Sequence, residues 1–423
     1  MPIDQTLLDD LEWRGLIAHS TDIDALREAL SSGSVRYYVG FDPTAPSLHM
    51  GNLLQIVTAM RLQRAGHTPF VLVGGATGMI GDPRDSGERT LNSNETVREW
   101  EAKVRAQIEP FLSFEGENAA TMVNNLDWTQ NLSTIDFLRD IGKHFPVNRM
   151  LARETVKRRL EAGGISYTEF SYVLLQSMDF LNLFRTHGVS LQFGGSDQWG
   201  NITGGAELIR RAEGGAAHAF ATPLITKADG TKYGKTEGGA LWLDPTMLSP
   251  YAFFQFWLNA EDEKVGELLR VFTFLPREEI EEIEALTAEK PFLRTGQKKL
   301  AEVMTTLVHG ADETARIQEA SAALFGGGEM TGLSADTLGA ALREAGSVQV
   351  PAAELPGIVD LFVTAGLVAS RNEARRAVKE GGAYLNNVRV TDPDAVPGES
   401  DLIGGTWLVL RRGKKSFKGV EVV

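Results

Sequence analysis

Short apolar runs alternate with longer amphipathic stretches over the first half of the chain. The runs VRYYVG (35–40) and PFVLVGG (69–75) are typical of buried strands, and GNLLQIVTAMRLQRAG (51–66) between them is typical of a helix. A strand, a helix and a strand at this spacing predict a βαβ unit, which builds a parallel sheet with a right-handed crossover. The run VSLQFGG (189–195) predicts a further strand, followed by a helix from about residue 197.

The second half has a different pattern. Residues 251–345 contain few strand-like runs and predict an α-helical domain. The stretch GSVQVPAAELPG has the glycine, proline and alanine content of a linker, which we place at 346–354. Beyond it, two short helical segments and the strand-like runs AYLNNVRV and TWLVLRRGKKSFKGV predict a small α/β domain over 355–423. The fold class is therefore α/β, with a parallel-sheet domain over 1–250.

The amino-acid composition excludes several classes of protein and of reactive site. Of the 423 residues, 43% are hydrophobic and 23% charged, which is ordinary for a globular protein. The N-terminal MPIDQTLLDDLEWRG is acidic and amphipathic, unlike a secretory signal, and no run approaches the roughly 18 apolar residues of a membrane span. The absence of cysteine excludes disulfides, cysteine nucleophiles and thiolate metal sites, and it favours a cytoplasmic protein.

The charge is unevenly distributed along the chain. The formal net charge is −14, but residues 355–423 contain ten lysines and arginines against eight aspartates and glutamates, a net charge of +2. A basic segment attached to an acidic body is typical of a module that contacts nucleic acid. A basic segment can also simply increase solubility, and the charge alone does not distinguish this from contact with nucleic acid.

Three glycine-rich segments stand where the predicted strands lead into helices. They are 40–52, 74–82 and 194–201, and loops of this kind bind ligands at the edge of an open parallel sheet. Neither a P-loop nor a Gly-x-Gly-x-x-Gly fingerprint occurs at these turns. His49 and Asn52 lie three apart at a helix start, where they either meet a phosphate or a ribose or face solvent.

The helix predicted over EFSYVLLQSMDFLNLF (169–184) carries three polar residues in an otherwise apolar sequence. Tyr172, Gln176 and Asp179 occupy positions i, i+4 and i+7, which share one helical face. Unpaired buried polar groups are costly, so this stripe either binds a small polar ligand or faces outward. The apolar neighbours weaken the second interpretation.

The stretch TKADGTKYGKTEGGALW (226–242) predicts a turn-rich loop with two lysines, Lys232 and Lys235. Two ammonium groups on such a loop suit transient contact with a polyphosphate. A solvated basic loop is the commoner explanation of an isolated pair of this kind.

Several of these strings resemble one family. HMGN (49–52) and KYGKT (232–236) resemble the His-x-Gly-His and Lys-Met-Ser-Lys-Ser signatures of class I aminoacyl-tRNA synthetases. YVGFDPTAPSLHMGN, GGATGMIGDP, SYVLLQSMDF, LQFGGSDQWGNIT and LITKADGTKYGKT, in this order, resemble bacterial tyrosyl-tRNA synthetases, and the similarity runs nearly end to end. The basic C-terminal domain is similar to an RNA-binding domain of a ribosomal small-subunit protein.

The resemblance implies a Rossmann-like nucleotide-binding domain, an α-helical anticodon-side domain and a small RNA-binding domain. It implies a ligase that activates L-tyrosine with ATP to tyrosyl-adenylate and pyrophosphate, then transfers tyrosine to the terminal adenosine of tRNA(Tyr). Mg²⁺ is expected on the ATP phosphates, with no tightly bound cofactor and no metal site in the protein. A homodimer with its interface at about 127–190 is implied, and neither DNA nor a membrane is expected as a partner.

The resemblance also assigns roles to matching positions. The residues implied to contact the tyrosine hydroxyl are Tyr38 and Asp179. Those implied to surround the α-ammonium group are Asp82, Tyr172 and Gln176, with Gln198 near the carboxylate or acyl-phosphate. Those implied to line the amino-acid and adenosine sites are Gly40, Asp42, Gly195 and, on the ribose, Asp197. Those implied to hold the triphosphate are Thr44, His49, Lys232 and Lys235.

Two departures from the family signatures stand out. Asn52 replaces the second histidine, and because an amide NH₂ donates a hydrogen bond much as an imidazole does, we expect its ribose contact to survive. Tyr233, Gly234 and Thr236 replace Met, Ser and the last Ser of the lysine signature, but both lysines remain.

The tRNA contacts implied are basic residues on two segments. On a helix predicted over 147–160 they are Arg149 and Arg153, accompanied by Lys157, Arg158 and Arg159, although a solvated basic face explains this pattern equally well. In the C-terminal domain they are Arg371, Arg375, Arg376 and Lys379 on one helix, joined by Arg411, Arg412, Lys414 and Lys415. Contacts of this kind are chiefly to phosphates and are salt-dependent.

Two other functions stay open from the sequence. A tryptophanyl-tRNA synthetase shares the fold and the nucleotide signatures, but Tyr38 with Asp179 favours a phenol over an indole. A noncatalytic RNA-binding factor on a synthetase fold is the second alternative. The retained His49, Asp197 and lysine pair argue against it.

Overall fold

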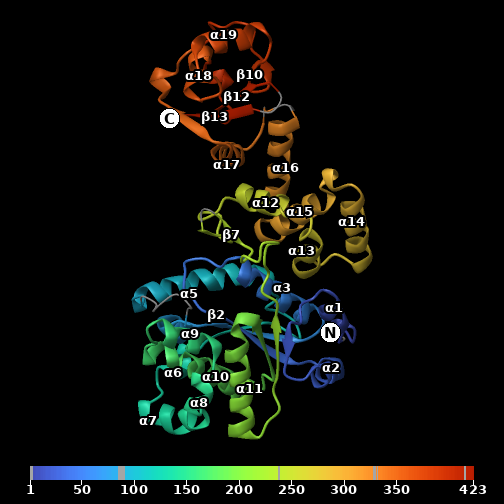
Figure 1. Cartoon of the computed structure of the whole chain (residues 1–423), viewed down its shortest axis with the longest axis vertical. Helices are drawn as coiled ribbons and strands as arrows, with labels where there is room; N and C mark the ends of the chain where they lie inside the picture. The colour runs from blue at the N-terminus through green and yellow to red at the C-terminus, as the bar shows by residue number, and fades with distance from the viewer. Residues whose placement is uncertain (1–2, 84–90, 237–238, 327–329, 331, 414–415) are drawn as a thin grey trace. The chain divides into compact units, whose positions relative to one another are not determined.

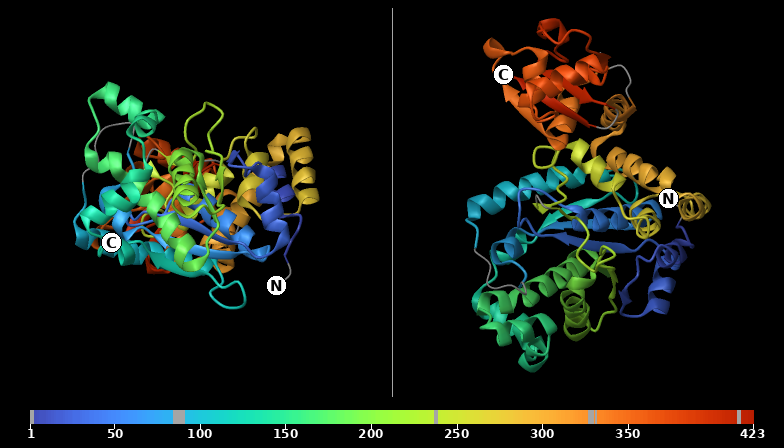
Figure 2. Two further views of the ribbon diagram at one scale, coloured as in Figure 1. Left: turned by 90° about the horizontal axis from the view of Figure 1, so that it is seen from below. Right: turned by 45° about the horizontal axis from the view of Figure 1, so that its top comes forward.

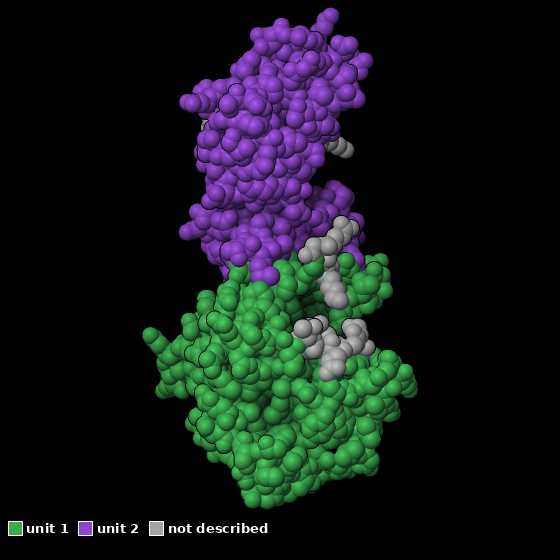
Figure 3. Space-filling view, turned by 90° about the vertical axis from the view of Figure 1, so that its left-hand side faces the viewer, with its two compact units in different colours: residues 1–244, 263–282 green, residues 245–262, 283–423 purple. Residues whose placement is uncertain are grey.

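The computed structural model describes residues 3–83, 91–236, 239–326, 330, 332–413 and 416–423 (Figure 1). The chain falls into two compact units (Figure 3): the first comprises residues 1–244 and 263–282, the second 245–262 and 283–423. The helical region predicted at 251–345 is therefore divided, because residues 263–282 pack within the first unit. Among the described residues, no helix is long and apolar enough to cross a bilayer.

A six-stranded sheet forms the centre of the first unit, in the order β1-β6-β5-β2-β3-β4. The strands are β1 (His19–Ser20), β2 (Arg36–Phe41), β3 (Thr68–Val73), β4 (Thr121–Asn124), β5 (Leu191–Gly195) and β6 (His218–Thr222). Neighbours pair in parallel, except that β1 runs antiparallel to β6. β2 and β3 are buried along most of their length, which explains their nearly continuous apolar runs.

Helices cover both faces of this sheet, with α3 and α5 on one face and α10 and α11 on the other (Figure 1 and Figure 2). The helices of the first unit are α1 (Leu7–Trp13), α2 (Ile23–Ser32), α3 (Met50–Arg64), α4 (Gly75–Ile80), α5 (Asn94–Ile108), α6 (Leu126–Thr129), α7 (Thr134–Asp136), α8 (Val147–Leu151), α9 (Glu154–Ala162), α10 (Tyr167–His187), α11 (Trp199–Glu213) and α13 (Val265–Phe272). The predicted βαβ unit is confirmed as β2, α3 and β3, with parallel partners from Arg36 and Thr68 to Phe41 and Val73.

The second unit combines packed helices with a small sheet. Its first helices are α12 (Pro250–Leu258), α15 (Thr295–His309), α16 (Ala311–Gly326) and α17 (Ala335–Ala345), while α14 (Arg277–Glu289) spans the boundary between the units. The sheet runs β11-β10-β12-β13-β9, built from β9 (Ser347–Val350), β10 (Ala383–Leu385), β11 (Val388–Arg389), β12 (Trp407–Arg412) and β13 (Ser416–Val422). Helices α18 (Ile358–Thr364) and α19 (Arg371–Lys379) share a buried apolar core with this sheet.

Two predicted elements differ from the structure. The segment placed as a linker, 346–354, contains β9, which pairs in parallel with β13 over Ser347–Val350. Proline and glycine at its ends suggested a loop, but the SVQV run between them completes the C-terminal sheet. The helix predicted over 147–160 is two helices, α8 and α9, because the backbone at Arg153 is extended (φ −68°, ψ 137°) and starts a new helix.

Candidate active site

The carboxyl ends of β2, β3 and β5 bring the three glycine-rich segments together, since β2 pairs in parallel with both other strands. The segments after β2 and β3 are joined by the Thr77 hydroxyl, which donates to the carboxylate of Asp42 at 2.6 Å. The segments after β3 and β5 are joined by the Gln198 amide, which donates to the carboxylate of Asp82 at 2.9 Å. These contacts place the predicted ligand loops side by side, as the sheet-edge argument requires.

A buried carboxylate on α10 anchors this region. Asp179 is only 1% exposed, and it accepts hydrogen bonds from the Asn125 amide and from the Trp128 indole, both at 2.9 Å. Burial raises the pKa of Asp179 to about 8, although these two donors oppose the shift. Burial, followed by the charges of Asp179 and Asp42, also raises the pKa of the Tyr38 phenol, so the two residues predicted for the tyrosine hydroxyl are electrostatically coupled.

A continuous chain of hydrogen bonds runs from Asp179 to the loop after β2. Asn125 also donates to the Thr77 hydroxyl at 2.9 Å, and Thr77 donates to Asp42. The other oxygen of Asp42 accepts from the Tyr172 hydroxyl at 2.6 Å. A side chain at Gly74 would put its Cβ 2.1 Å from the Asp42 carboxylate, so only glycine lets this chain close. Tyr172 and Asp179, predicted on one face of α10, are the two ends of the chain.

Two further acceptors lie at α4 and α10, which pack against each other. Asp82, after α4, accepts from Gln198 and from Asn201, each at 2.9 Å. The Oε1 atom of Gln176, on α10, is buried and has no hydrogen-bond partner among the described residues. A buried acceptor of this kind costs about 1–3 kcal/mol until a donor reaches it. A bound ammonium group would supply that donor.

His49 and Asn52 form a capping box at the start of α3. The Nδ1 atom of His49 accepts from the Gly51 N–H, and the Asn52 side-chain oxygen accepts from the His49 N–H, each at 3.1 Å. Desolvation of the imidazole lowers the pKa of His49, against its own backbone hydrogen bond and the attraction of Asp197. The two residues are therefore fixed at a helix N-terminus, where anions bind favourably.

The lysine loop packs directly on this helix start. A Cβ on Gly234, whose φ of +86° also favours glycine, would lie 2.9 Å from the sulfur of Met50. The Met50 N–H donates to the Leu241 carbonyl at 3.0 Å, which ties the start of α3 to the end of this loop. Lys232 is exposed on this loop, whereas the side chain of Lys235 lies outside the part of the chain that the structure describes.

The remaining residues predicted for ATP lie at the same edge. Thr44 is exposed, and its N–H donates to the Asp42 carbonyl at 2.8 Å. Asp197 is exposed above Gly195, where a Cβ would lie 2.6 Å from the Asp197 carboxylate. Gly40 is exposed at the end of β2, with the Tyr38 hydroxyl 3.6 Å from the position of a Cβ. Because neither glycine has a side chain, a ligand could approach the backbone at both positions, next to a polar side chain.

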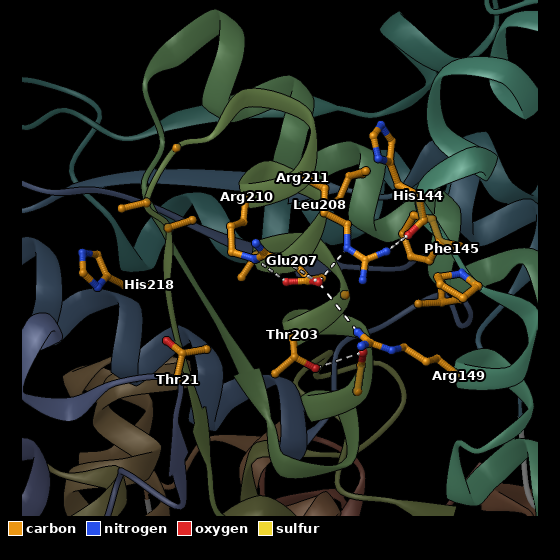
Figure 4. A pocket seen from close by; sticks show the side chains of 18 of the residues that line it. Thr21, His144, Phe145, Arg149, Thr203, Glu207, Leu208, Arg210, Arg211 and His218 are labelled. Carbon is orange, nitrogen blue, oxygen red and sulfur yellow. Dashed lines mark hydrogen bonds and ion pairs between the residues drawn. The ribbon is translucent and has the colours of Figure 1, made fainter.

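A separate cavity of about 830 Å³ lies beside α11 (Figure 4). At its centre Glu207 pairs with Arg211 at 2.6 Å, Arg210 at 2.8 Å and Arg149 at 3.8 Å. The neighbouring guanidinium groups, Arg210 above all, lower the pKa of Glu207 to about 2. Of the residues predicted to bind a substrate or tRNA, only Arg149 and Arg153 line this cavity, so it is distinct from the tyrosine and ATP region.

Other arginines near Arg153 contribute less exposed charge than predicted. Arg159 is 3% exposed and pairs with buried Glu169 at 2.6 Å, so its charge is neutralised inside the fold. Arg158 pairs with Glu154 at 3.5 Å. The predicted basic face over 147–160 is therefore only partly a solvent-facing surface.

In the C-terminal domain, four of the predicted RNA contacts lie exposed on α19: Arg371, Arg375, Arg376 and Lys379. Arg411 differs, because it is 7% exposed, its guanidinium donates to the Leu324 carbonyl, and burial lowers its pKa. Arg412 donates to the Leu367 carbonyl at 3.1 Å and pairs with Glu373 at 2.7 Å. The guanidinium of Arg411 thus joins β12 to α16 and is largely removed from solvent, and Lys414 and Lys415 lie outside the described residues.

Sequence reasoning missed three residues of this network: Asn125, Trp128 and Asn201. Asn125 and Trp128 follow β4 directly, in the string NNLDW. The sheet-edge argument would have found Asn125 if a strand had been predicted at 121–124, but the TMVN run is short and half-polar. Asn201 lies one turn beyond Gln198, and its spacing alone carries no signal of a ligand.

Comparisons with known proteins identify the family. A family model described as tRNA synthetases class I (W and Y) matches residues 30–326, and one described as Tyrosine--tRNA ligase SYY-like C-terminal domain matches residues 340–420. A curated Tyrosine--tRNA ligase of Streptomyces coelicolor is 62% identical over 418 residues, covering 98% of this chain and 99% of that protein. The chain belongs to the class I tyrosine–tRNA ligases.

Other relatives of this ligase agree. The Tyrosine--tRNA ligase of Thermobifida fusca is 58% identical over 426 residues, covering 98% of this chain and 99% of that protein. A C-terminally truncated mitochondrial tyrosyl-tRNA synthetase of Aspergillus nidulans has a TM-score of 0.68 at 31% identity, covering 75% of this chain and 94% of that one. The predicted family, fold class and ligase activity are confirmed. The tryptophanyl and noncatalytic alternatives lose their support.

Replacing Trp128 with Phe should weaken tyrosine binding and change its pH dependence. The change removes one of two neutral donors to Asp179 but keeps an aromatic ring, so the pKa of Asp179, already about 8, should rise further. Because the ionised carboxylate is the better acceptor for a phenol, KM for tyrosine in ATP–pyrophosphate exchange should rise about fivefold at pH 7.5 and less at pH 9. The control is Trp13→Phe, and an equal KM for the Trp128 variant and the parent at both pH values would contradict the assignment.

Proposed function

We propose that this ligase activates tyrosine at the carboxyl edge of β2, β3 and β5. The observation that supports this most directly is the buried hydrogen-bond chain from Asp179 through Asn125, Thr77 and Asp42 to Tyr172. It gives an otherwise apolar region one rigid polar wall. A polar wall of this kind suits a ligand with an apolar ring and a polar end.

In the proposed complex, the tyrosine hydroxyl lies between Tyr38 and Asp179 and donates to the carboxylate. Phenylalanine in the same place would leave a buried polar position unpaired, at a cost of about 1–3 kcal/mol. This difference favours tyrosine without a separate editing step.

The amino-acid end of tyrosine would be held by the acceptors at α4 and α10. The α-ammonium group would donate to Asp82 and to the unpartnered Oε1 of Gln176, while Gln198 lies near the substrate carboxylate. Because the Tyr172 hydroxyl already donates to Asp42, it would meet the ammonium group as an acceptor, through its oxygen.

The chemistry proposed needs no protein nucleophile and no general base. The tyrosine carboxylate is ionised at pH 7 and attacks the α-phosphorus of ATP. A carboxylate–phosphorus bond forms, the bond to the β-phosphate oxygen breaks, and pyrophosphate leaves. The protein aligns the reactants and stabilises the developing charge. A ribose hydroxyl of the terminal adenosine of tRNA(Tyr) then attacks the activated carbonyl, and AMP leaves.

The nucleotide would be bound by the loops at the sheet edge. The residues proposed on its adenosine are Gly40, Asp42, Asn52, Gly195 and Asp197. Those proposed on its phosphates are Thr44, His49, Lys232 and Lys235. ATP enters as its magnesium complex, in which the metal is held through phosphate oxygens and water. Because its substrates occur in the cytoplasm, we place the enzyme there.

Pyrophosphate exchange without tRNA tests this proposal. Exchange should occur with tyrosine and not with phenylalanine or tryptophan. Replacing Lys232 and Lys235 with Ala should lower kcat about a hundredfold, because removing charge from the leaving pyrophosphate acts on the transition state. Tyrosine affinity by equilibrium dialysis should stay within twofold. The matched control is Lys227→Ala on the same loop, and a parallel collapse of tyrosine affinity would show that the lysines do not act on the leaving group.

We also propose a homodimer through the segment at about 127–190. Supporting this, exposed apolar side chains gather there: Ile135, Leu138, Val147, Leu151, Leu160 and Tyr167. Ile135 and Tyr167 keep 69% and 68% of their surface exposed, and large apolar side chains exposed to this extent are often covered by a partner.

Charged substitutions at this surface should dissociate the dimer. Ile135→Glu with Val147→Glu should move the protein to the monomer mass in sedimentation equilibrium, since each carboxylate would be buried unpaired in the interface. Leu224→Glu, an exposed leucine outside the segment, is the control. A parent enzyme that is already monomeric at micromolar concentration would disprove the interface.

We further propose that tRNA contacts Arg149, Arg153, Arg412 and the basic face of α19. Replacing Arg375, Arg376 and Lys379 with Ala should raise KM for tRNA about tenfold and flatten its salt dependence, because phosphate contacts release counterions. Pyrophosphate exchange should not change. The control removes three basic residues from α5, Arg98, Lys103 and Arg105. If the variant charges tRNA with the same KM and the same dependence of KM on salt concentration as the parent, α19 does not contact tRNA.

A further inference from the structure

Asn201 lies between the residues proposed for tyrosine and Arg153, which is half-buried. It lies in the first turn of α11 and is 4% exposed. Its Nδ2 atom donates to the Asp82 carboxylate and to the Gln198 side-chain oxygen, both at 2.9 Å. Its Oδ1 atom accepts from the Nη2 of Arg153 at 2.6 Å. Both hydrogens of the amide and its oxygen are thus engaged.

The chemistry of these partners fixes the orientation of both amides. A guanidinium only donates and a carboxylate only accepts, so the oxygen of Asn201 must face Arg153 and its NH₂ must face Asp82. Gln198 then has its NH₂ on Asp82 and its oxygen on Asn201. Asp82, Gln198 and Asn201 close a triangle in which no amide can flip without placing like groups together.

Arg153 reaches this triangle from outside the tyrosine region. It precedes α9 and lines the arginine-rich cavity beside α11. A Cβ on Gly200 would lie 2.6 Å from its Nη2, so the glycine next to Asn201 is what lets the guanidinium approach. Burial lowers the pKa of Arg153 and the Asp82 charge opposes that shift, which places the cation within the field of the carboxylate.

We infer that Asn201 is a positioning residue for tyrosine activation and that Arg153 holds it in place. This inference rests on the proposed contacts of Asp82 and Gln198 with tyrosine. Asn201 presents one Asp82 oxygen and the Gln198 NH₂ in a single arrangement before substrate arrives. Arg153 then acts in the first half of the reaction, in the absence of tRNA, besides its proposed tRNA contact.

Pyrophosphate exchange without tRNA separates the positioning role of Asn201 and Arg153 from the proposed tRNA contact of Arg153. Asn201→Ala should raise KM for tyrosine about tenfold, because Asp82 and Gln198 each lose a partner, while KM for ATP changes less than twofold. Arg153→Ala should raise KM for tyrosine about threefold to tenfold, and Arg153→Lys should recover part of the loss. The matched control is Arg210→Ala, which removes an arginine from the same cavity without touching Asn201.

A second variant keeps the test valid if Asn201→Ala does not fold. Asn201→Asp still accepts from Arg153, but donates to Asp82 only when protonated. Its KM for tyrosine, relative to the parent, should therefore fall as the pH is lowered from 8 to 6, which a merely structural defect would not produce. Folding is checked by thermal unfolding of each variant.

Two results would overturn the inference. One is an unchanged KM for tyrosine in folded Asn201→Ala and pH-independent behaviour of Asn201→Asp. The other is an Arg153→Ala variant that loses only tRNA charging. Asp82→Ala distinguishes a failure of the underlying proposal: if it too leaves KM for tyrosine unchanged, Asp82 does not bind tyrosine. If it raises KM while the Asn201 variants do not, only the positioning role is wrong.

Discussion

A carboxyl group buried in an apolar helix is the constraint on which the hydrogen-bond chain from Asp179 to Tyr172 depends. Asp179 lies among Met178, Phe180 and Leu181, residues that pack α10 against the sheet. Burying a carboxyl group away from water is costly in either protonation state, so this position is tolerable only with hydrogen bonds supplied by the protein. The donors come from the turn after β4, which must therefore lie against α10. One buried carboxyl group thereby fixes how a helix, a strand end and a turn meet.

The donors to Asp179 are neutral, and this determines what the site can still bind. An arginine partner would have satisfied both oxygens at once in a bidentate pair. The amide of Asn125 and the indole of Trp128 each occupy one position on a carboxylate that can accept about four hydrogen bonds. The pKa near 8 reflects this incomplete compensation. A phenol hydroxyl would add the kind of partner that is missing, so in the proposed complex the recognition of tyrosine also completes the hydrogen bonding of a buried carboxyl group.

The sequence predicted the parts of the site that depend on local pattern. The stripe on α10 followed from helical spacing, and the convergence of three loops followed from parallel-strand topology. Contacts that depend on tertiary packing could not be predicted: nothing in NNLDW shows that its amide and indole meet a helix more than 50 residues away. The burial of Arg411 could not be predicted for the same reason, because nothing in a basic segment indicates that this guanidinium donates to the carbonyl of Leu324.

The replacement of histidine by Asn52 keeps a structural role at the start of α3 and, in the proposed complex, a ligand contact as well. At the start of α3, its side-chain oxygen caps the His49 N–H, while the imidazole of His49 caps Gly51. This reciprocal arrangement holds both side chains at the positive end of the helix. With a histidine at position 52, one imidazole nitrogen would have to accept the hydrogen bond from the His49 N–H, and the other nitrogen would have to donate to the ligand. Asparagine divides the same two tasks between its oxygen and its NH₂. The substitution therefore keeps the helix start and the donor, and it loses only a group that titrates near neutral pH.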